Sequence, residues 1–491
     1  MISGKSVERV NLRENAMILI IFFLSTIWFI FQHRVCVGWD FAAYVLNAKY
    51  WFGERIYFEP LRPPLTPFII GVFGSVFGWK ASEYLYIILT SSIFLFSTLK
   101  LAKSLNLNRL CFYAISLNIY VLLTGLFVGT ELLSFAFLQL FIAGLIEGKN
   151  SGHFLALSSL TRYNLLSMLP LLICYKKPRK IIKNFLLFFF VWLPWLIYNY
   201  FSYGNILASF FDNYLLNIKE RQYMYQTFNP THILLVTNFL TPFFFLSLFH
   251  FLLSLRRKPI TLKFLLSKKI EFLMLLIFII TILLYINTPL KDPRFLFNLT
   301  LPVVYFSSIA YPFKKFRKSL MLFSITIFIF SLISSLLLSP QETDSCLQPY
   351  KAAVERIENL NLKNCSMMSN GWVYLNYLGQ ASKPSLRKEL VLPLIQEGEL
   401  ILLFYHISEP EYTKNSTFIE NLPIIYKDNR YVLIGNSRCK EKEIFDMSYL
   451  NQLAQIIQKI YNYSIDENYC KLIFDNDVLA KLCNLATYLK N

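Results

Sequence analysis

Long apolar segments alternate with short basic clusters along the first two thirds of the chain. Several of these segments reach about 20 residues, the length at which a helix crosses the hydrocarbon core of a bilayer. The pattern therefore predicts a mainly α, polytopic bundle of membrane-spanning helices whose first span covers about residues 16–34. The polar stretch 34–81 is predicted to be the first loop on the outer side, with a surface helix at 65–79.

The basic clusters predict the orientation of these segments, because Lys and Arg concentrate in the cytoplasmic loops of membrane proteins. Placing every cluster on the cytoplasmic side puts the N-terminus, 1–15, in the cytoplasm and gives about eleven crossings over 16–339. The segment 152–175 is too short for two full spans, so we expect two short helices whose meeting point is shielded by protein. The predicted crossings are 16–34, 82–101, 108–125, 131–147, the pair within 152–175, 182–201, 231–255, 270–287, 295–313 and 319–339.

The tail, residues 340–491, changes in composition and is predicted to be a small extracytoplasmic α/β domain. It carries 16 Lys and Arg against 18 Asp and Glu, whereas the rest of the chain carries 32 against 12. The net charge of +18 therefore lies beside the apolar segments, where membrane topology explains it and nucleic-acid binding does not. The patterns in the tail predict helices at 349–360, 451–461 and 477–489 and strands at 399–405 and 431–435.

Cysteines and glycosylation sequons also concentrate in this tail. Five of the eight cysteines lie there, so one or two disulfides are expected, with their pairing left open. The cysteine spacing matches no zinc pattern, and no metal is expected. Three Asn-x-Ser/Thr sequons, at Asn364, Asn415 and Asn462, can be glycosylated only on the outer face.

The first outer loop contains the strongest candidate for a catalytic side chain. Asp40 directly follows Trp39 at the predicted membrane edge. An interfacial aromatic residue beside a solvated acid is the alternative interpretation. As a general base, Asp40 must lie within hydrogen-bond reach of the proton that it abstracts, and partial desolvation raises the pKa of such a carboxyl towards a useful range.

Three arginines are candidates for binding a phosphate. Arg62 precedes a Pro-Pro-Leu sequence, and a guanidinium at that depth can bind a lipid phosphate through two hydrogen bonds. The alternative is a cation that reaches the interface ahead of a helix with proline in its first turn. Arg162 lies inside an apolar run, where a charge is normally paired or functional. Arg294 ends an Asp-Pro-Arg turn that is otherwise explained as an ion-paired loop.

Four further residues are supporting candidates. Glu131 has an alternative interpretation as a favourable charge at a helix N-terminus, next to Thr130 near the cap. Tyr163 lies where the two short helices of 152–175 are expected to meet. The supporting candidates are Glu54, Glu59, Glu131 and Tyr163.

Together these features resemble the GT-C membrane glycosyltransferases, particularly the dolichyl-phosphate-mannose–protein mannosyltransferases and the bacterial aminoarabinose transferases that act on lipid A. In that superfamily a catalytic acid in the first outer loop is followed by an aromatic-rich helix and a basic-Pro-Pro-Leu turn. Asp40, the stretch 42–51 and the turn 62–65 match this order. Arg162 matches a basic residue between two short helices, and Arg294 matches a late arginine followed by an aromatic residue.

The resemblance covers about residues 16–340, and it has one clear departure. Many relatives carry two adjacent acids in the first loop, whereas Phe41 follows Asp40 here, so Glu54 or Glu59 would have to supply the second acid. The resemblance implies transfer of a sugar, with inversion, from a polyprenyl-phosphate donor of the dolichyl-phosphate type. Asp40 would deprotonate an acceptor hydroxyl, and the three arginines would hold the departing lipid phosphate, without a metal or a cofactor.

Two other classes of function compete with this interpretation. A transporter or flippase of a lipid-linked or small polar substrate would typically show inverted repeats and charges near the middle of the membrane. A receptor or scaffold for the tail would not bring the acid and the arginines together. The sequence leaves open which sugar is transferred and whether the acceptor is a protein, a lipid or a glycan; no nucleic-acid partner is expected.

Overall fold

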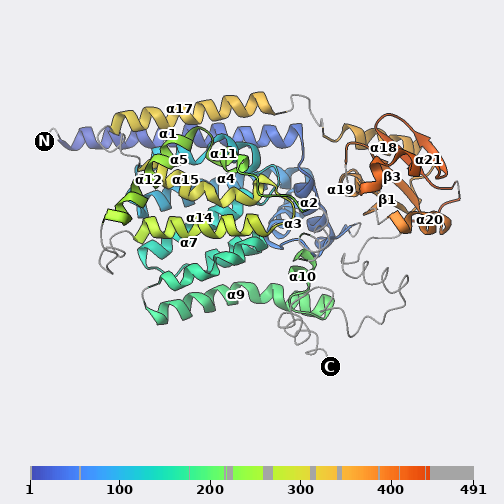
Figure 1. Ribbon diagram of the computed structural model, residues 1–491, viewed down its shortest axis with the longest axis horizontal. Coiled ribbons are helices and arrows are strands. Elements are labelled where there is room, and N and C mark those ends of the chain that lie inside the picture. The colour runs from blue at the N-terminus through green and yellow to red at the C-terminus, as the bar shows by residue number, and fades with distance from the viewer. Residues whose placement is uncertain are drawn as a thin grey trace.

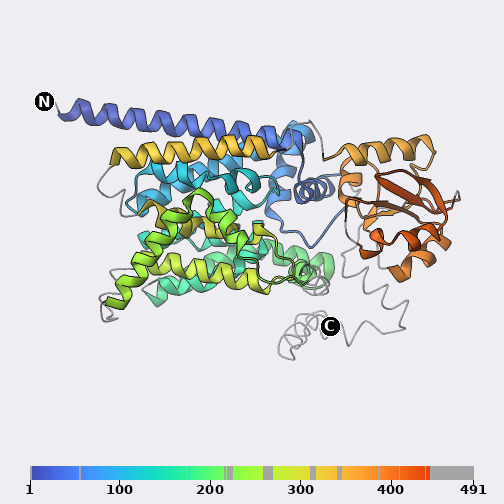
Figure 2. The same ribbon diagram turned by 45° about the horizontal axis from the view of Figure 1, so that its top comes forward.

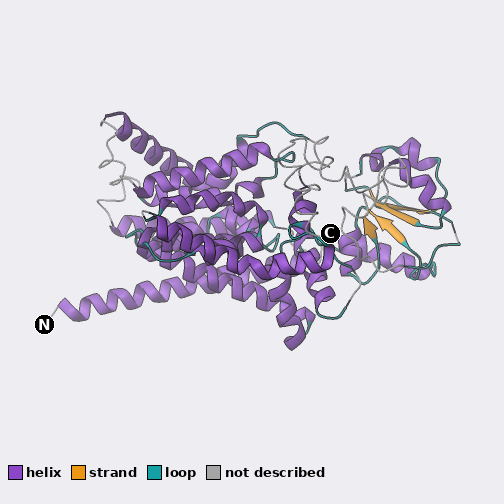
Figure 3. Cartoon of the chain, turned by 90° about the horizontal axis from the view of Figure 1, so that it is seen from below, coloured by secondary structure: helices purple, strands orange, loops and turns teal. Residues whose placement is uncertain are grey.

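The computed structural model is a bundle of long helices with a small sheet-containing unit at one end (Figures 1 and 3). The N-terminus lies at the opposite end of the bundle from this unit (Figure 2). The structure describes residues 3–54, 57–175, 177–214, 217, 225–257, 269–309, 317–339, 346–384, 388–407, 410–436 and 438–442.

Six helical segments are long and apolar enough to cross a membrane, by length and composition, among the described residues. They coincide with six of the predicted spans, and the helices turn exposed apolar side chains such as Phe190 and Leu337 outwards. The segments are Leu12–Val35 of α1 (Ser3–Val35), α4 (Trp79–Ser104), α9 (Pro178–Tyr203), Thr231–Leu255 across α11 (Thr231–Thr237), η4 (Asn238–Leu240) and α12 (Thr241–Arg257), α14 (Lys269–Asn287), and Met321–Leu338 of α17 (Arg317–Leu338).

The other predicted crossings fall on shorter helices. The span expected at 108–125 is divided because Asn118 accepts hydrogen bonds from the backbone amides of Tyr120 and Val121 and so starts a second helix. Of the eleven predicted crossings, six coincide with segments of full length within the described ranges, and the full count stays a prediction. The shorter helices are α5 (Arg109–Ser116), α6 (Ile119–Thr124), α7 (Glu131–Glu147), η5 (Pro293–Leu299) and α15 (Thr300–Ser308).

The two short helices expected within 152–175 are present. They are α8 (Gly152–Thr161) and η1 (Tyr163–Cys174), and they meet at Arg162, whose extended backbone ends the first helix. The stretch 65–79 forms a helix, as expected, which is α3 (Leu65–Phe77) and begins after the Pro-Pro pair; its place on the membrane surface stays a prediction. Proline is tolerated there, because a backbone N–H in the first turn of a helix has no acceptor within the helix, so its absence costs nothing.

The tail contains a five-stranded sheet of order β2-β1-β3-β5-β4. The central strand β3 pairs parallel with β1 and antiparallel with β5, and the predicted helix at 349–360 and strands at 399–405 and 431–435 correspond to α18, β3 and β5. The elements are α18 (Gln348–Asn359), β1 (Met367–Ser369), α19 (Trp372–Tyr377), β2 (Lys383–Pro384), α20 (Lys388–Gln396), β3 (Leu400–Phe404), η6 (Glu411–Lys414), α21 (Ser416–Glu420), β4 (Ile424–Lys427) and β5 (Tyr431–Ile434). The helices expected at 451–461 and 477–489 lie outside the described residues.

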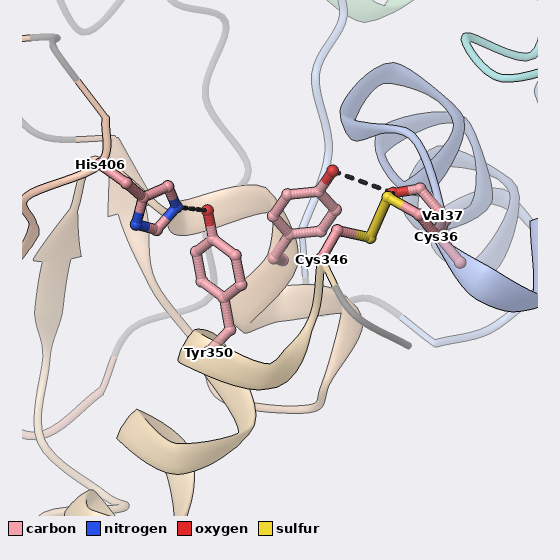
Figure 4. Close-up of a disulfide and its surroundings, with 6 residues drawn as sticks. Cys36, Val37, Cys346, Tyr350 and His406 are labelled. Carbon is pink, nitrogen blue, oxygen red and sulfur yellow. Dashed lines mark hydrogen bonds between the residues drawn. A yellow bond between two sulfur atoms is a disulfide. The ribbon is translucent and has the colours of Figure 1, made fainter. Parts of the chain in front are cut away.

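Two disulfides form, and one of them links the tail to the membrane part. Cys365 and Cys439 are joined within the tail, with Cα atoms 5.4 Å apart. Cys346 is joined to Cys36, which follows the end of α1, with Cα atoms 5.3 Å apart (Figure 4). Both separations are normal for a disulfide. The sequence predicted disulfides in the tail, but it did not indicate a partner outside it.

Candidate active site

Asp40 lies in the first turn of α2 (Trp39–Trp51), directly after the first long helix. The chain before Asp40 passes so close to Phe127 that position 38 requires glycine, because a Cβ atom there would lie 1.9 Å from the backbone carbonyl oxygen of Phe127. The chain can therefore pass close against the 125–130 loop and start a new helix at once. A carboxylate in the first turn is also favoured by the positive end of the helix dipole.

Two predicted phosphate-binding arginines converge on Asp40. Arg62 Nη1 donates to Asp40 Oδ1 at 2.7 Å, and Arg294 Nη1 donates to Oδ2. Arg294 is also part of an ion-paired turn, because Asp292 accepts a hydrogen bond from its backbone amide at 2.9 Å and lies 3.1 Å from its Nε. The turn interpretation is thus correct, and the same guanidinium still reaches the candidate base.

Glu59 holds Arg62 from the other side. Its Oε2 accepts a hydrogen bond from Arg62 Nε, and its Oε1 accepts one from the Tyr57 hydroxyl. The backbone of Glu59 is clamped by Asn47 of α2, which donates to its carbonyl at 2.8 Å and accepts from its amide at 2.9 Å. Glu54, the other candidate for a second acid, instead pairs with Lys49 at 3.3 Å on a partly exposed edge.

A second acid–arginine pair lies close by. Arg162 Nη1 donates to Oε1 of Glu131, the first residue of α7, whose side chain is fully buried. Glu131 therefore lies at a helix N-terminus, as its alternative interpretation expects, and it also pairs with Arg162. The Tyr163 hydroxyl instead accepts a hydrogen bond from Trp195 Nε1 of α9 at 2.9 Å.

Tyr44 interacts electrostatically with both acid–arginine pairs and was not among the predicted site residues. The Arg62 guanidinium is 5.3 Å from the centre of its ring. Burial raises the pKa of Tyr44 to about 12, and charges on both acid–arginine pairs act on it as well. The signal was present in the sequence, since Tyr44 follows Asp40 by four residues and so shares its face of the helix.

The charge state of Asp40 follows from two opposing effects. Burial alone would raise the pKa of this carboxyl, but the Arg62 and Arg294 guanidinium groups outweigh burial and hold the pKa well below its usual range. Asp40 is therefore ionised at neutral pH, and with both arginines in place it is a weak proton acceptor. Its side chain is 19% exposed, so it remains within reach of another molecule.

A cavity lies beside the charged site. A cavity of about 560 Å³ adjoins the turn that carries Arg294, and its polar lining includes Asn229, His232 and Lys291. Over the parts of the chain that the structure describes, no group of three or more His, Cys, Asp and Glu side chains could hold a metal ion. The charged site thus consists of carboxylates and guanidinium groups, a set suited to binding an anion and accepting a proton.

A bundle of long apolar helices, an acid at the start of α2 and an α/β tail beside it are the features in which the chain resembles the GT-C membrane glycosyltransferases. Among the solved structures that match are two of ArnT, an aminoarabinose transferase of that family. The structure titled ArnT from Cupriavidus metallidurans bound to undecaprenyl phosphate matches with a TM-score of 0.55 and 11% identity, over 88% of this chain and 98% of that one. The ligand-free structure of the same protein matches with a TM-score of 0.56 and 10% identity, over 87% and 98%.

These matches confirm the GT-C resemblance at the level of the fold. No protein family and no curated protein sequence matches the chain. At 10–11% identity the likeness concerns architecture, so the chemistry of this chain has to be argued from its own residues.

Proposed function

We propose that the chain is an integral membrane glycosyltransferase that moves a sugar from a polyprenyl-phosphate donor to an acceptor hydroxyl. The observation that carries this proposal is the convergence of Arg62 and Arg294 on Asp40, from segments far apart in the sequence. Guanidinium groups suit a lipid phosphate because their planar N–H donors match its oxygens. The ArnT structure with undecaprenyl phosphate supports a ligand of this class.

Donor binding and base activation are coupled in this proposal. The donor phosphate takes over hydrogen bonds that Arg62 and Arg294 otherwise make with Asp40. Once the guanidinium charges are shared with the phosphate, less positive charge acts on Asp40, and burial then raises its pKa. A carboxylate whose pKa moves upwards is a better general base. Asp40 therefore becomes an effective proton acceptor only when a donor is in place.

The transfer step is a single displacement with inversion. Asp40 accepts the proton of the acceptor hydroxyl, whose oxygen forms the new bond to the anomeric carbon. The bond between that carbon and the phosphate oxygen breaks, and its electron pair leaves with the lipid phosphate. Arg62 and Arg294 stabilise the charge that develops there. Arg162 can contribute to the same phosphate while keeping Glu131, because a guanidinium has five N–H donors.

The site is proposed to face the outer side of the cell membrane, with the N-terminus in the cytoplasm and residues 340–491 as an outer domain. Two disulfides support this orientation, because such bonds persist in oxidising compartments. Positive charge supports it as well: Lys100 and Lys103 lie in the last turns of α4, at the end remote from Trp79 and the site. The proposed layout keeps 16–339 as the catalytic module.

The experiment is a transfer assay with the purified protein in nanodiscs. Labelled sugar on native polyprenyl-phosphate lipids is offered together with membrane extract as a source of protein, lipid and glycan acceptors. Transfer by the wild type, and its loss in Asp40→Asn, is the expected result. A protein that moves labelled lipid or sugar across the bilayer without forming any glycosylated product would instead be a transporter.

A further inference from the structure

The tail contacts the membrane part directly beside Asp40. Helix α19 packs against α2, as the neighbouring labels in Figure 1 show. The ring of Trp39 makes edge-to-face contacts with Trp372 and Tyr374, with ring centres 4.9 and 5.1 Å apart. The Tyr374 hydroxyl donates to the backbone carbonyl of Val37 at 2.9 Å, next to the disulfide that joins the two parts (Figure 4).

One side chain of this interface reaches the ionised site. Trp372 Nε1 donates to the Tyr57 hydroxyl at 2.6 Å and lies 3.1 Å from Glu59 Oε1. Tyr57 donates in turn to the same carboxylate oxygen, and the other oxygen of Glu59 accepts from Arg62. A continuous set of hydrogen bonds thus runs from the tail through Glu59 to Arg62 and on to Asp40.

Tyr57 and Glu59 are buried, so the carboxylate of Glu59 depends on hydrogen-bond donors from the protein. The residues Tyr57 and Glu59 are 1% and 6% exposed, so water is a poor substitute for a missing donor. A buried carboxylate that loses a hydrogen-bond donor pays a desolvation cost unless it moves. Movement of Glu59 would release Arg62 Nε and change the direction in which that guanidinium presents its remaining donors.

We propose that Trp372 of the tail is a positioning residue, which holds Glu59 and thereby orients Arg62 for the donor phosphate. This inference rests on the proposed function of Arg62 as a phosphate-binding residue. It assigns a role to the tail: α19 completes a site whose other residues belong to the membrane part. Tyr374, whose hydroxyl donates to a backbone carbonyl in the same interface, provides the matched comparison.

The test compares Trp372→Phe with Tyr374→Phe in the full-length protein. Each variant keeps an aromatic ring and loses one donor across the same interface. We expect Trp372→Phe to weaken the binding of undecaprenyl phosphate about tenfold, a change of about 1.4 kcal/mol. Tyr374→Phe should bind the lipid with an affinity within about twofold of that of the wild type, a difference no larger than the usual deviation from additivity at independent sites. Thermal unfolding of both variants shows whether each remains folded.

A double-mutant cycle tests the route through Glu59. If Trp372 acts through that carboxylate, adding Trp372→Phe to Glu59→Gln should cost much less than it does in the wild type. Equal losses in Trp372→Phe and Tyr374→Phe, or additive losses in the cycle, would overturn the inference. If Trp372→Phe does not fold, Tyr57→Phe interrupts the same connection from the membrane side and takes its place.

The probe in these experiments is undecaprenyl phosphate, so the result does not depend on the transfer reaction. A wild type that binds the lipid and shows the coupling, yet transfers no sugar, would refute the proposed activity and leave the positioning role intact. A wild type that transfers sugar with an additive cycle would refute the positioning role alone.

Discussion

Replacing Asp40 by asparagine should change donor binding and catalysis in opposite directions. In the ligand-free protein Asp40 competes with a phosphate for Arg62 and Arg294, because each of its oxygens accepts from one of them. Asn keeps the size of the side chain but removes its charge. The Asp40→Asn protein should therefore bind undecaprenyl phosphate more tightly while losing the ability to accept a proton.

The sizes of both effects follow from the contacts. A hydrogen bond to a charged group contributes about 1.5–3 kcal/mol, and a neutral amide oxygen keeps part of that. If phosphate binding no longer has to displace about 1.4 kcal/mol of this interaction, the affinity rises about tenfold. Loss of a general base lowers the rate by about 10²–10⁴-fold. The rate should thus fall even at saturating donor.

The assay measures undecaprenyl phosphate affinity by calorimetry and sugar transfer by single-turnover kinetics, on the same nanodisc preparations. Arg62→Gln should weaken binding, and Glu54→Gln should change neither quantity, because Glu54 pairs with a lysine at a partly exposed edge. If Asp40→Asn weakens lipid binding as Arg62→Gln does, Asp40 orients the arginines and does not compete with the donor. Undiminished transfer by Asp40→Asn would exclude it as the base.

Three further predictions concern pH, the disulfide and topology. Donor binding should raise the low pKa of Asp40, so the carboxyl should take up a proton on binding and a phosphodiester analogue should bind more tightly as the pH falls. Calorimetry in buffers of different ionisation enthalpy measures this proton uptake, which should be absent in Asp40→Asn. Cys36→Ser should lower the melting temperature and the lipid affinity, since it frees the tail beside α2, and an unchanged affinity would show that α19 docks without the covalent link. An impermeant thiol reagent on intact cells should label a cysteine introduced near Asn415 and not one near Lys258; the reverse pattern would invert the proposed orientation.

The sequence was informative where a residue conflicted with its surroundings. Arg162 is a charge in an apolar run, and Asp40 is an acid at the edge of a span, so each needed a partner or a function. Both have partners in the structure: Arg162 pairs with Glu131, and Asp40 pairs with two arginines. The six long apolar segments were likewise readable, because length and hydropathy are local properties of the chain.

The partners of these residues could not be predicted from the sequence, because they lie far away in the chain and a local pattern carries no information about them. Arg162 pairs with Glu131, 31 residues earlier, and Cys36 pairs with Cys346, 310 residues later. The division of the span expected at 108–125 had a local cause, the capping Asn118, but a single polar residue among apolar ones is a weak signal. Glu59 and Glu54 looked equivalent in sequence, and only the fold separates them.

Trp372 is a second residue whose role could not be predicted from the sequence, and through it the tail contributes to the site. In sequence it is one aromatic residue at the start of a six-residue helix, with nothing to distinguish it from a core side chain. Its indole N–H acquires a role because the disulfide at Cys36 and the ring of Trp39 bring α19 onto α2. A buried carboxylate such as Glu59 needs donors, and the membrane part supplies Tyr57 while the tail supplies Trp372. The position of Arg62 therefore depends on both parts of the chain, although every charged residue of the site lies in one of them.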